Sequence, residues 1–294
     1  MKILTKVEEK NLVWRFRFAM WSLALARVGR SKLITRLIER FCYFEEGQRL
    51  QIIAPYHVNL LMHLDIHSWV ERKILSAGYF ERWVDIFLDR ALKPGYVAID
   101  VGANSGCHTL VMASAVGGSG KVVAFEPNPR MFNRLQANVK LNRLENVDLC
   151  PVALSDQSGI VTLHIPKDGD YNQGLGSIHS ANLEEASDQI NVPKISLDDW
   201  VDEHYLSRID LIKIDVEGHE MQVFKGAYQT LKKFKPILIF EFSERQWRNA
   251  GVTAEQVEKL LGDLEYDLYV MRRNVTTSIR SGIREEGDVL ALPR

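Results

Sequence analysis

The sequence predicts an α/β fold built on an open, doubly wound, mostly parallel sheet. From residue 96 onward, apolar runs of strand length alternate with helical patterns of about 10–15 residues. A glycine-bearing turn follows the first of these runs, and ionisable residues gather where later runs end. Ligands of this architecture bind beyond the carboxyl ends of the strands. We therefore expect the functional residues just after each strand.

The individual elements follow from periodicity and from glycine or proline boundaries. We expect strands at 96–100, 121–125, 147–153, 160–165, 209–215, 237–242, 267–271 and 289–292. We expect helices at 107–116, 128–141, 221–234 and 252–262. The stretch 166–193 is rich in Gly, Asp, Asn and Ser and lacks a clear period, so we expect a lid or a substrate loop there.

The first part of the chain has a different character. Residues 7–41 carry Trp14, Phe18 and Trp21 at helical spacing, which predicts an amphipathic helix. Apolar runs at 49–53 and 57–62 surround Pro55-Tyr56 and make a hairpin a candidate, and helices are expected at 67–77 and 80–92. We therefore divide the chain into a helical, basic N-terminal extension, residues 1–65, and a main domain, residues 66–294.

The charge is unevenly distributed along the 294 residues. The net charge is −1, which gives no case for a nucleic-acid partner, but residues 1–40 hold 10 Lys and Arg against 3 Glu. Such a basic arm suits either a helix packed on the main domain with a solvated basic face or a peripheral contact with an anionic membrane. No apolar run reaches the ~18 residues expected of a spanning helix.

The three cysteines are scattered without metal-ligand spacing, which is typical of buried thiols in a reducing compartment. These features predict a cytoplasmic protein, with a membrane-peripheral location left open.

The segment DVGANSG at residues 100–106 joins a strand to a helix through a turn containing Gly102 and Gly106. Glycines let a ligand approach the backbone, and the helix N-terminus offers unpaired N–H groups. Asn104 stands where a dinucleotide fingerprint has its middle glycine, and the phosphate-loop pattern also fails. Taken alone, the turn could be purely structural.

Two further positions favour a nucleoside. Glu126 ends the second expected strand, 20 residues after Gly106, where a carboxylate can accept hydrogen bonds from both ribose hydroxyls. Its charge would repel a 2′-phosphate. After the third strand, Ala153 could lie against an adenine ring, which needs flat apolar walls.

An acidic cluster follows the strand at 209–215. Asp215 and Glu217 share one side of the chain if the extended conformation persists, and Gly218, His219 and Glu220 come next. Titratable groups gathered at a strand end are typical of a functional site, although a solvated loop is the simpler alternative. Glu241 ends an adjacent strand and is a further candidate.

At this point the sequence resembles the FkbM family of methyltransferases. The resemblance rests on Asp-Val-Gly-Ala-Asn-x-Gly, Phe-Glu-Pro-Asn, Val-Ala-Leu-Ser-Asp and Lys-Ile-Asp-Val-Glu-Gly-x-Glu in this order, between about residues 74 and 241. It implies a class I methyltransferase fold with a Rossmann-like, seven-stranded sheet that has one antiparallel strand. It also implies S-adenosyl-L-methionine as cofactor and O-methylation of a hydroxyl on a sugar, a glycan or a secondary metabolite.

By motif, the resemblance implies roles for individual residues. Those at the cofactor would be Asp100, Gly102, Asn104, Gly106, Glu126 and Ala153, with Glu126 at the ribose. Those near the transferred methyl would be Asp215, Glu217 and Glu220, and His219 occupies a position that the family varies.

The mechanism leaves alternatives open. His219 or Asp215 could remove the acceptor's proton. Alternatively Asp215, Glu217 and Glu241 could hold a divalent cation, although we assign no metal ligand. Two other functions compete: a nicotinamide dehydrogenase, which Asn104 argues against, and a non-catalytic nucleoside-binding module with a membrane- or partner-binding N-terminal helix.

Overall fold

The computed structural model describes residues 51–65, 68–167, 176–182, 187–272, 275–279 and 282–294. The chain divides into two compact units, Met1–Phe80 and Glu81–Arg294, and each is described by itself. The helix expected over 7–41 lies outside the described residues. The division between residues 65 and 66 stays a prediction.

The described part of the first unit is a hairpin followed by one helix. It comprises β1 (Gln51–Tyr56), β2 (Leu60–Asp65) and α3 (Trp69–Ala77). The hairpin is confirmed, but its turn spans residues 57–59, not Pro55-Tyr56. Pro55 instead pairs with Leu61 inside the ladder. His57 and Asn59 take the positive φ values that a tight hairpin loop requires, and asparagine tolerates this conformation well.

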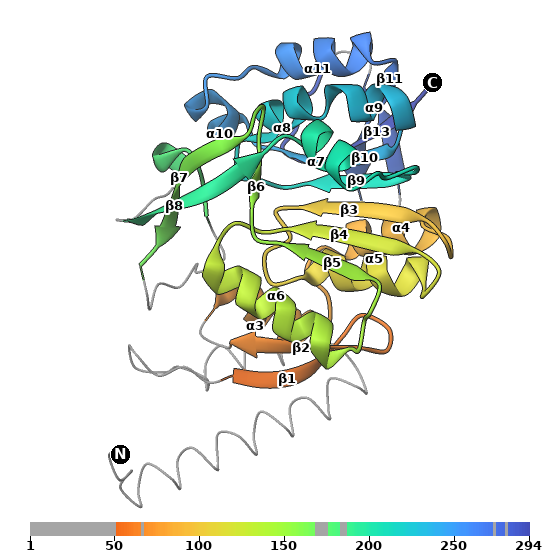
Figure 1. Cartoon of the computed structure of the whole chain (residues 1–294), viewed down its shortest axis with the longest axis vertical. Helices are drawn as coiled ribbons and strands as arrows, with labels where there is room; N and C mark the ends of the chain where they lie inside the picture. The colour runs from red at the N-terminus through yellow and green to blue at the C-terminus, as the bar shows by residue number, and fades with distance from the viewer. Residues whose placement is uncertain (1–50, 66–67, 168–175, 183–186, 273–274, 280–281) are drawn as a thin grey trace, which may run out of the picture. The chain divides into compact units, whose positions relative to one another are not determined.

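The second unit is built on a large twisted sheet whose strand order is β12-β11-β13-β10-β9-β3-β4-β5 (Figure 1). Its strands are β3 (Val97–Val101), β4 (Lys121–Phe125), β5 (Val147–Cys150), β9 (Leu211–Ile214), β10 (Ile237–Phe242), β11 (Tyr266–Arg272), β12 (Val275–Ser278) and β13 (Gly287–Pro293). The five strands from β10 to β5 run parallel, and β13 is antiparallel to both of its neighbours. The expected seven-stranded sheet is therefore confirmed, with β12 added as an antiparallel edge strand.

Helices cover both faces of this sheet (Figure 1). On one side lie α4 (Arg82–Ala91), α5 (Cys107–Val116) and α6 (Pro129–Leu141), and on the other α7 (Leu197–Glu203), α8 (Glu220–Gly226), α9 (Tyr228–Phe234), α10 (Glu244–Asn249) and α11 (Ala254–Asp263). The second side encloses a core in which Phe125, Phe224, Phe240 and Trp247 are buried. Such burial of large apolar side chains is the main force that fixes the layers.

Two expectations needed correction. The helix expected at 221–234 is interrupted at Ala227. The preceding Gly226 packs so tightly on the Ser155 backbone that a Cβ there would lie 1.9 Å from the Ser155 carbonyl oxygen. The stretch 166–193 is partly regular, since β8 (Ser187–Ile195) pairs with β7 (Gly159–Pro166) and η1 (Ser180–Asn182) precedes it. With β6 (Ala153–Leu154), these strands form a small sheet of order β6-β8-β7.

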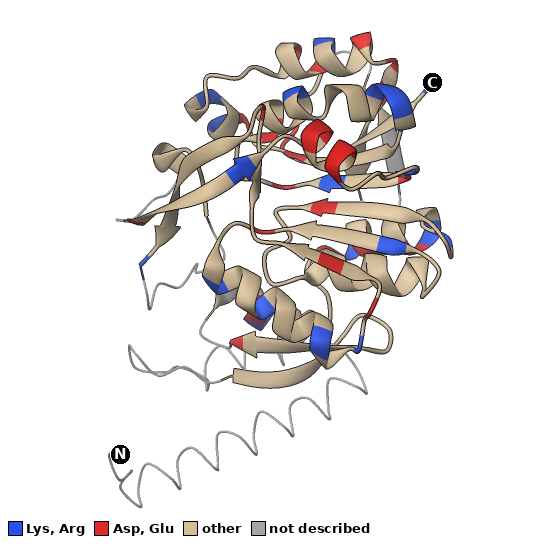
Figure 2. Ribbon diagram, viewed as in Figure 1, with Lys and Arg blue, Asp and Glu red and all other residues tan. Residues whose placement is uncertain are grey.

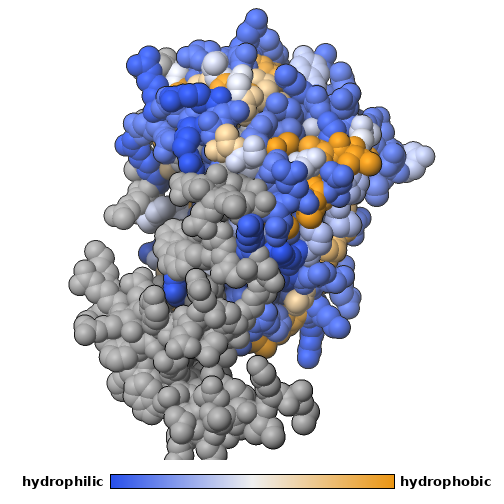
Figure 3. All heavy atoms as spheres, turned by 90° about the vertical axis from the view of Figure 1, so that its left-hand side faces the viewer, coloured by the Kyte–Doolittle hydropathy of each residue, from blue (hydrophilic) through white to orange (hydrophobic). Residues whose placement is uncertain are grey.

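Within the described ranges, no helix combines the length and the hydropathy needed to cross a bilayer. Figure 3 shows a mainly hydrophilic face on which the visible apolar residues form small groups. Apolar residues on the surface are ordinary in folded domains, and Ile160 is 75% exposed.

Candidate active site

The turn after β3 brings the backbone unusually close to a neighbouring strand. Gly102 has φ +80°, and a Cβ added there would lie 1.9 Å from the carbonyl oxygen of Asp215. Gly106, at φ +96°, begins α5 and would clash with Leu135 if it carried a side chain. Gly102 therefore holds the turn against the end of β9, and the positive φ of Gly106 favours glycine at the start of α5.

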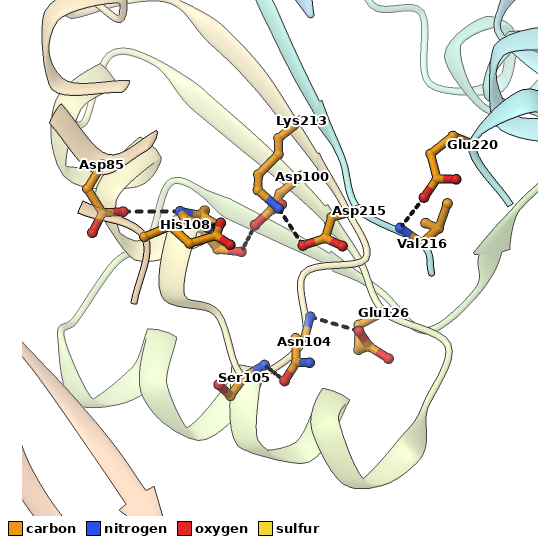
Figure 4. Close-up of polar contacts among 12 residues, drawn as sticks. Asp85, Asp100, Asn104, Ser105, His108, Glu126, Lys213, Asp215, Val216 and Glu220 are labelled. Carbon is orange, nitrogen blue, oxygen red and sulfur yellow. Dashed lines mark hydrogen bonds and ion pairs between the residues drawn. The ribbon is translucent and has the colours of Figure 1, made fainter. Parts of the chain in front are cut away.

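Asn104 occupies the middle of this turn with φ +51°, a conformation that asparagine tolerates. Its side-chain oxygen accepts a hydrogen bond from the Ser105 backbone N–H at 2.7 Å (Figure 4). Its own backbone N–H donates to Glu126 Oε2 at 2.7 Å. The asparagine that argues against a dinucleotide fingerprint thus stabilises the turn locally.

Glu126 lies just beyond β4 and is buried among these groups. Its other oxygen, Oε1, accepts from the Asn128 backbone N–H at 2.8 Å. Burial raises the pKa of Glu126 to about 7, and the charges of Asp100 and Asp215 raise it further, whereas the two backbone hydrogen bonds oppose the shift. Each oxygen keeps a lone pair, so the carboxyl group can still accept a ligand hydroxyl.

Asp100, on β3, has one satisfied oxygen and one orphaned oxygen. Oδ2 accepts a hydrogen bond from Thr109 Oγ1 at 2.5 Å, while the buried Oδ1 has no partner among the described residues. Buried polar atoms are nearly always paired in native proteins, so an orphan beside a glycine turn indicates a missing donor. The ammonium group of S-adenosyl-L-methionine is a donor of the required kind.

Ala153 lies in β6, in a small apolar cluster with Leu163, Ile165 and Val192. It is 4% exposed, so most of its surface already contacts protein. The contact with adenine that we expect for this residue stays a prediction.

The turn after β9 is held from three sides. Glu217 has φ +53°, and its backbone carbonyl accepts hydrogen bonds from Ser177 Oγ at 2.9 Å and from Asn182 Nδ2 at 2.7 Å. The Glu217 side chain accepts from Gln246 Nε2. Burial raises its pKa to about 8, and the charges of Asp215 and Glu220 add to the effect.

Glu220 maintains the shape of this turn. Oε1 accepts from the backbone N–H groups of Val216 and Gly218, each at 3.2 Å, and Oε2 accepts from Trp247 Nε1 at 2.9 Å. The residue is 1% exposed. Its carboxyl group is therefore committed to structure and is poorly placed to meet an acceptor.

His219 is held by two side chains outside the acidic cluster. Its Nε2 lies 3.0 Å from Ser155 Oγ and its Nδ1 lies 3.4 Å from His179 Nε2, so both ring nitrogens are engaged. Burial lowers the pKa of His219 to about 4, and His179 lowers it further. This environment does not favour the general-base role that the sequence allows for His219.

Asp215 and Glu241 lie on neighbouring strands together with a buried lysine. Lys213 Nζ donates to Asp215 Oδ2 at 2.9 Å (Figure 4). Burial alone would lower the pKa of Lys213, but Asp215, Glu81 and Asp100 raise it, so the ammonium stays charged. Burial raises the pKa of Glu241 to about 9, with the charges of Asp215, Glu217 and Glu220 adding to the shift.

Besides Lys213, four ionisable residues that the sequence reasoning missed complete this network. His108, on α5, lies 3.1 Å from Asp85 and 3.0 Å from Glu81. Burial and Lys213 lower its pKa, but the two carboxylates outweigh them and raise the pKa to about 10. Asp288 pairs with Glu241 across β13 and β10. Figure 2 shows other basic residues on α6 and α9.

One sequence signal could have identified Lys213. It stands two residues before Asp215 on the same strand, so both side chains share one face of the sheet. His108, Glu81 and Asp85 have no such local signal, because their contacts join residues 23 and 27 positions apart in the chain.

The structure therefore brings two groups of predicted residues to one edge of the sheet. The glycine turn and Glu126 form the first, and Asp215, Glu217 and Glu241 form the second, with Gly102 and Asp215 in direct backbone contact. Across the described ranges, no three His, Cys, Asp or Glu side chains are arranged so as to hold a metal ion.

Comparison with known proteins agrees with this geometry. The sequence matches the Methyltransferase FkbM domain over residues 100–268, which is more than half of the chain. A second family, protein-L-isoaspartate(D-aspartate) O-methyltransferase (PCMT), matches residues 22–156, which is less than half.

Individual relatives are more distant. The chain is 30% identical to 2-O-methyltransferase NoeI of Sinorhizobium fredii, over 59% of this chain and 74% of that protein. It is 29% identical to hexuronic acid methyltransferase AglP of Haloferax volcanii, over 60% of this chain and 65% of that protein. A solved methyltransferase FkbM from Methylobacillus flagellatus KT aligns with 75% of this chain and 52% of its own at 13% identity and a TM-score of 0.44.

The family match, the strand order and the glycine turn agree with one another, and they favour a methyltransferase over a dehydrogenase or a non-catalytic module. The chain belongs to the FkbM methyltransferase family and is an S-adenosyl-L-methionine-dependent methyltransferase.

Proposed function

We propose that this protein transfers a methyl group to a hydroxyl oxygen of a sugar, a glycan or a related secondary metabolite. The observation that carries the proposal is the contact between the two halves of the site, where Gly102 touches the Asp215 backbone. NoeI is named as a 2-O-methyltransferase and AglP as a hexuronic acid methyltransferase, which supports a sugar-like acceptor.

S-Adenosyl-L-methionine, when bound, supplies an electrophilic methyl group on a sulfonium that is already a good leaving group. The protein's task is then mainly alignment and the exclusion of water. Gly102, Asn104 and Gly106 would shape the surface that receives the cofactor. Glu126 would accept hydrogen bonds from its ribose hydroxyls, and Asp100 Oδ1 would accept one from its ammonium group. Ala153 borders the adenine.

Asp215 is the residue that we propose to take the acceptor's proton. Its side chain is 27% exposed, and its Oδ2 accepts a hydrogen bond from Lys213 Nζ at 2.9 Å. Glu241 and Glu217 have raised pKa values, about 9 and 8, so at neutral pH they hold a proton and can donate a hydrogen bond to an acceptor oxygen. His219, whose pKa is lowered to about 4, serves the turn and does not act as the base.

Release of S-adenosylhomocysteine from labelled cofactor, in the presence of cellular glycan and lipid extracts, tests the proposal. We expect acceptor-dependent turnover by the full chain, a large loss in Asp215→Asn and a small loss in His219→Ala. Retention of activity in Asp215→Asn would remove the proposed base. Loss of turnover on treatment with a chelator, and its restoration by a divalent cation, would replace the base by a metal.

For the N-terminal extension we propose a peripheral membrane contact through residues 7–41, at a cytoplasmic surface. The support is the net charge of the first 40 residues, in which 10 Lys and Arg face 3 Glu. Flotation of the full chain with anionic vesicles at low salt, and its loss at high salt, is the expected result. Absence of flotation at low salt would overturn this proposal and leave the methyl transfer unaffected.

A further inference from the structure

Asn128 occupies a buried position directly beside Glu126. It is the N-cap of α6, two residues after the carboxylate, and only 2% of it is exposed. Its backbone N–H donates to Glu126 Oε1 at 2.8 Å. The residue is therefore fixed to the group that we expect at the ribose.

The orientation of the Asn128 amide is determined by its surroundings. Its side-chain oxygen accepts a hydrogen bond from the Arg130 backbone N–H at 3.0 Å, which caps the helix. The reversed amide would set an NH2 group against that N–H, so the oxygen must occupy this side. The Nδ2 donor consequently points away from α6.

This donor has no partner. Nδ2 of Asn128 is buried, and no described residue accepts a hydrogen bond from it. Gly176 packs beside this donor, since a Cβ added there would lie 3.8 Å from Nδ2, an ordinary van der Waals contact. A buried amide donor without an acceptor is unfavourable, and native proteins keep few of them.

A second orphan lies near Glu126. Asp100 Oδ1 is an acceptor without a donor, and Asn128 Nδ2 is a donor without an acceptor. Glu126 links the two regions, because its carboxyl group bonds both to Asn104 of the glycine turn and to Asn128. An acceptor at Asp100 and a donor at Asn128 together suit a ligand that has an ammonium group at one end and hydrogen-bond acceptor atoms at the other.

We propose that Asn128 is a cofactor-binding residue whose Nδ2 donates a hydrogen bond to an acceptor atom of the nucleoside half of S-adenosyl-L-methionine. The inference rests on the proposed cofactor site around Glu126. The nucleoside half is specified because Asn128 adjoins the ribose carboxylate, whereas Asp100 adjoins the amino-acid end. The simpler alternative is that Asn128 serves only as a helix cap.

Serine separates the two roles. Serine caps helices about as well as asparagine but lacks the amide donor, whereas alanine lacks both functions. We expect Asn128→Ser to keep the wild-type Tm and to bind S-adenosylhomocysteine about tenfold more weakly by calorimetry, which corresponds to about 1.4 kcal/mol. Asn128→Ala should lose both stability and affinity.

The ligand series locates the contact. 5′-Methylthioadenosine keeps the nucleoside but lacks the amino-acid end, so Asn128→Ser should weaken its binding by the same factor. Asn191→Ser, on exposed β8, is the matched control and should change neither property. Wild-type affinity of Asn128→Ser for both ligands would overturn the inference, as would a loss confined to S-adenosylhomocysteine. Failure of the wild-type protein to bind either ligand would instead overturn the proposed cofactor site.

Discussion

Replacement of Gly102 by alanine tests the close approach on which the site depends. The new Cβ would lie 1.9 Å from the Asp215 carbonyl oxygen and 2.9 Å from its carbonyl carbon. Both atoms belong to backbone, so a rotamer change cannot relieve the overlap. The turn and the end of β9 must therefore move apart.

The magnitude follows from two terms. Alanine at φ +80° costs about 1–2 kcal/mol, and a methyl group forced into filled space adds about 1–3 kcal/mol, so the free energy of unfolding should fall by about 2–5 kcal/mol. Gly117 provides the control because it also has a positive φ, +63°, but a Cβ there would meet nothing within 4 Å. Gly117→Ala should lose about 1–3 kcal/mol from backbone strain alone.

Chemical denaturation and calorimetry with S-adenosylhomocysteine give the two quantities to compare. We expect Gly102→Ala to bind at least about tenfold more weakly, since such a shift moves both halves of the site, and Gly117→Ala to bind like the wild type. Wild-type affinity in a folded Gly102→Ala variant would refute the reasoning.

Three other predictions follow from the buried charges and from the turn after β9. The pKa of Glu241 rises from its ordinary 4.5 to about 9 on folding, so the ligand-free protein should lose stability as the pH rises from about 5 to 9. In denaturation measured at stepped pH, the free energy of unfolding of Glu241→Gln should depend less on pH than that of the wild type. Lys213→Met removes the counter-charge of neighbouring carboxylates and should lower the free energy of unfolding by about 3–5 kcal/mol. Lys121→Met, at an exposed ion pair, should change it by about 1 kcal/mol or less. Equal losses of stability in the two variants would contradict this prediction. Asn182→Ala removes one of two donors to the Glu217 carbonyl and should speed amide exchange in the turn, unlike Asn191→Ala; unchanged exchange would count against this clamp.

Much of the fold could be predicted because its signals are local. Strand runs, glycine stops and the spacing from the glycine turn to Glu126 all lie within short stretches of sequence, and they gave the parallel sheet and the position of its functional edge. The extra strand β12 and the division of the helix at Ala227 depend instead on partners distant in the chain. Gly226, which packs on the Ser155 backbone, is an example that no helical periodicity could reveal.

In the candidate site, too, features with local sequence signals could be predicted, whereas features that depend on distant contacts could not. Strand parity was applied to Asp215 and Glu217, but the chain leaves the extended conformation after Ile214 and Glu217 has φ +53°, so that expectation was wrong. Sequence could not show that both ring nitrogens of His219 are engaged, since one partner is 64 residues away in the chain. The pKa values of these groups also depend on burial, which appears only after the sheet and the helices have packed.

Calorimetric titration of the full chain with S-adenosylhomocysteine is the most direct test of the cofactor site. We expect one molecule bound per chain, with the affinity reduced about tenfold or more by Glu126→Ala and with no binding of NAD. Saturable binding of NAD, or an unchanged affinity in a folded Glu126→Ala variant, would contradict a cofactor site formed by the glycine turn and this carboxyl group.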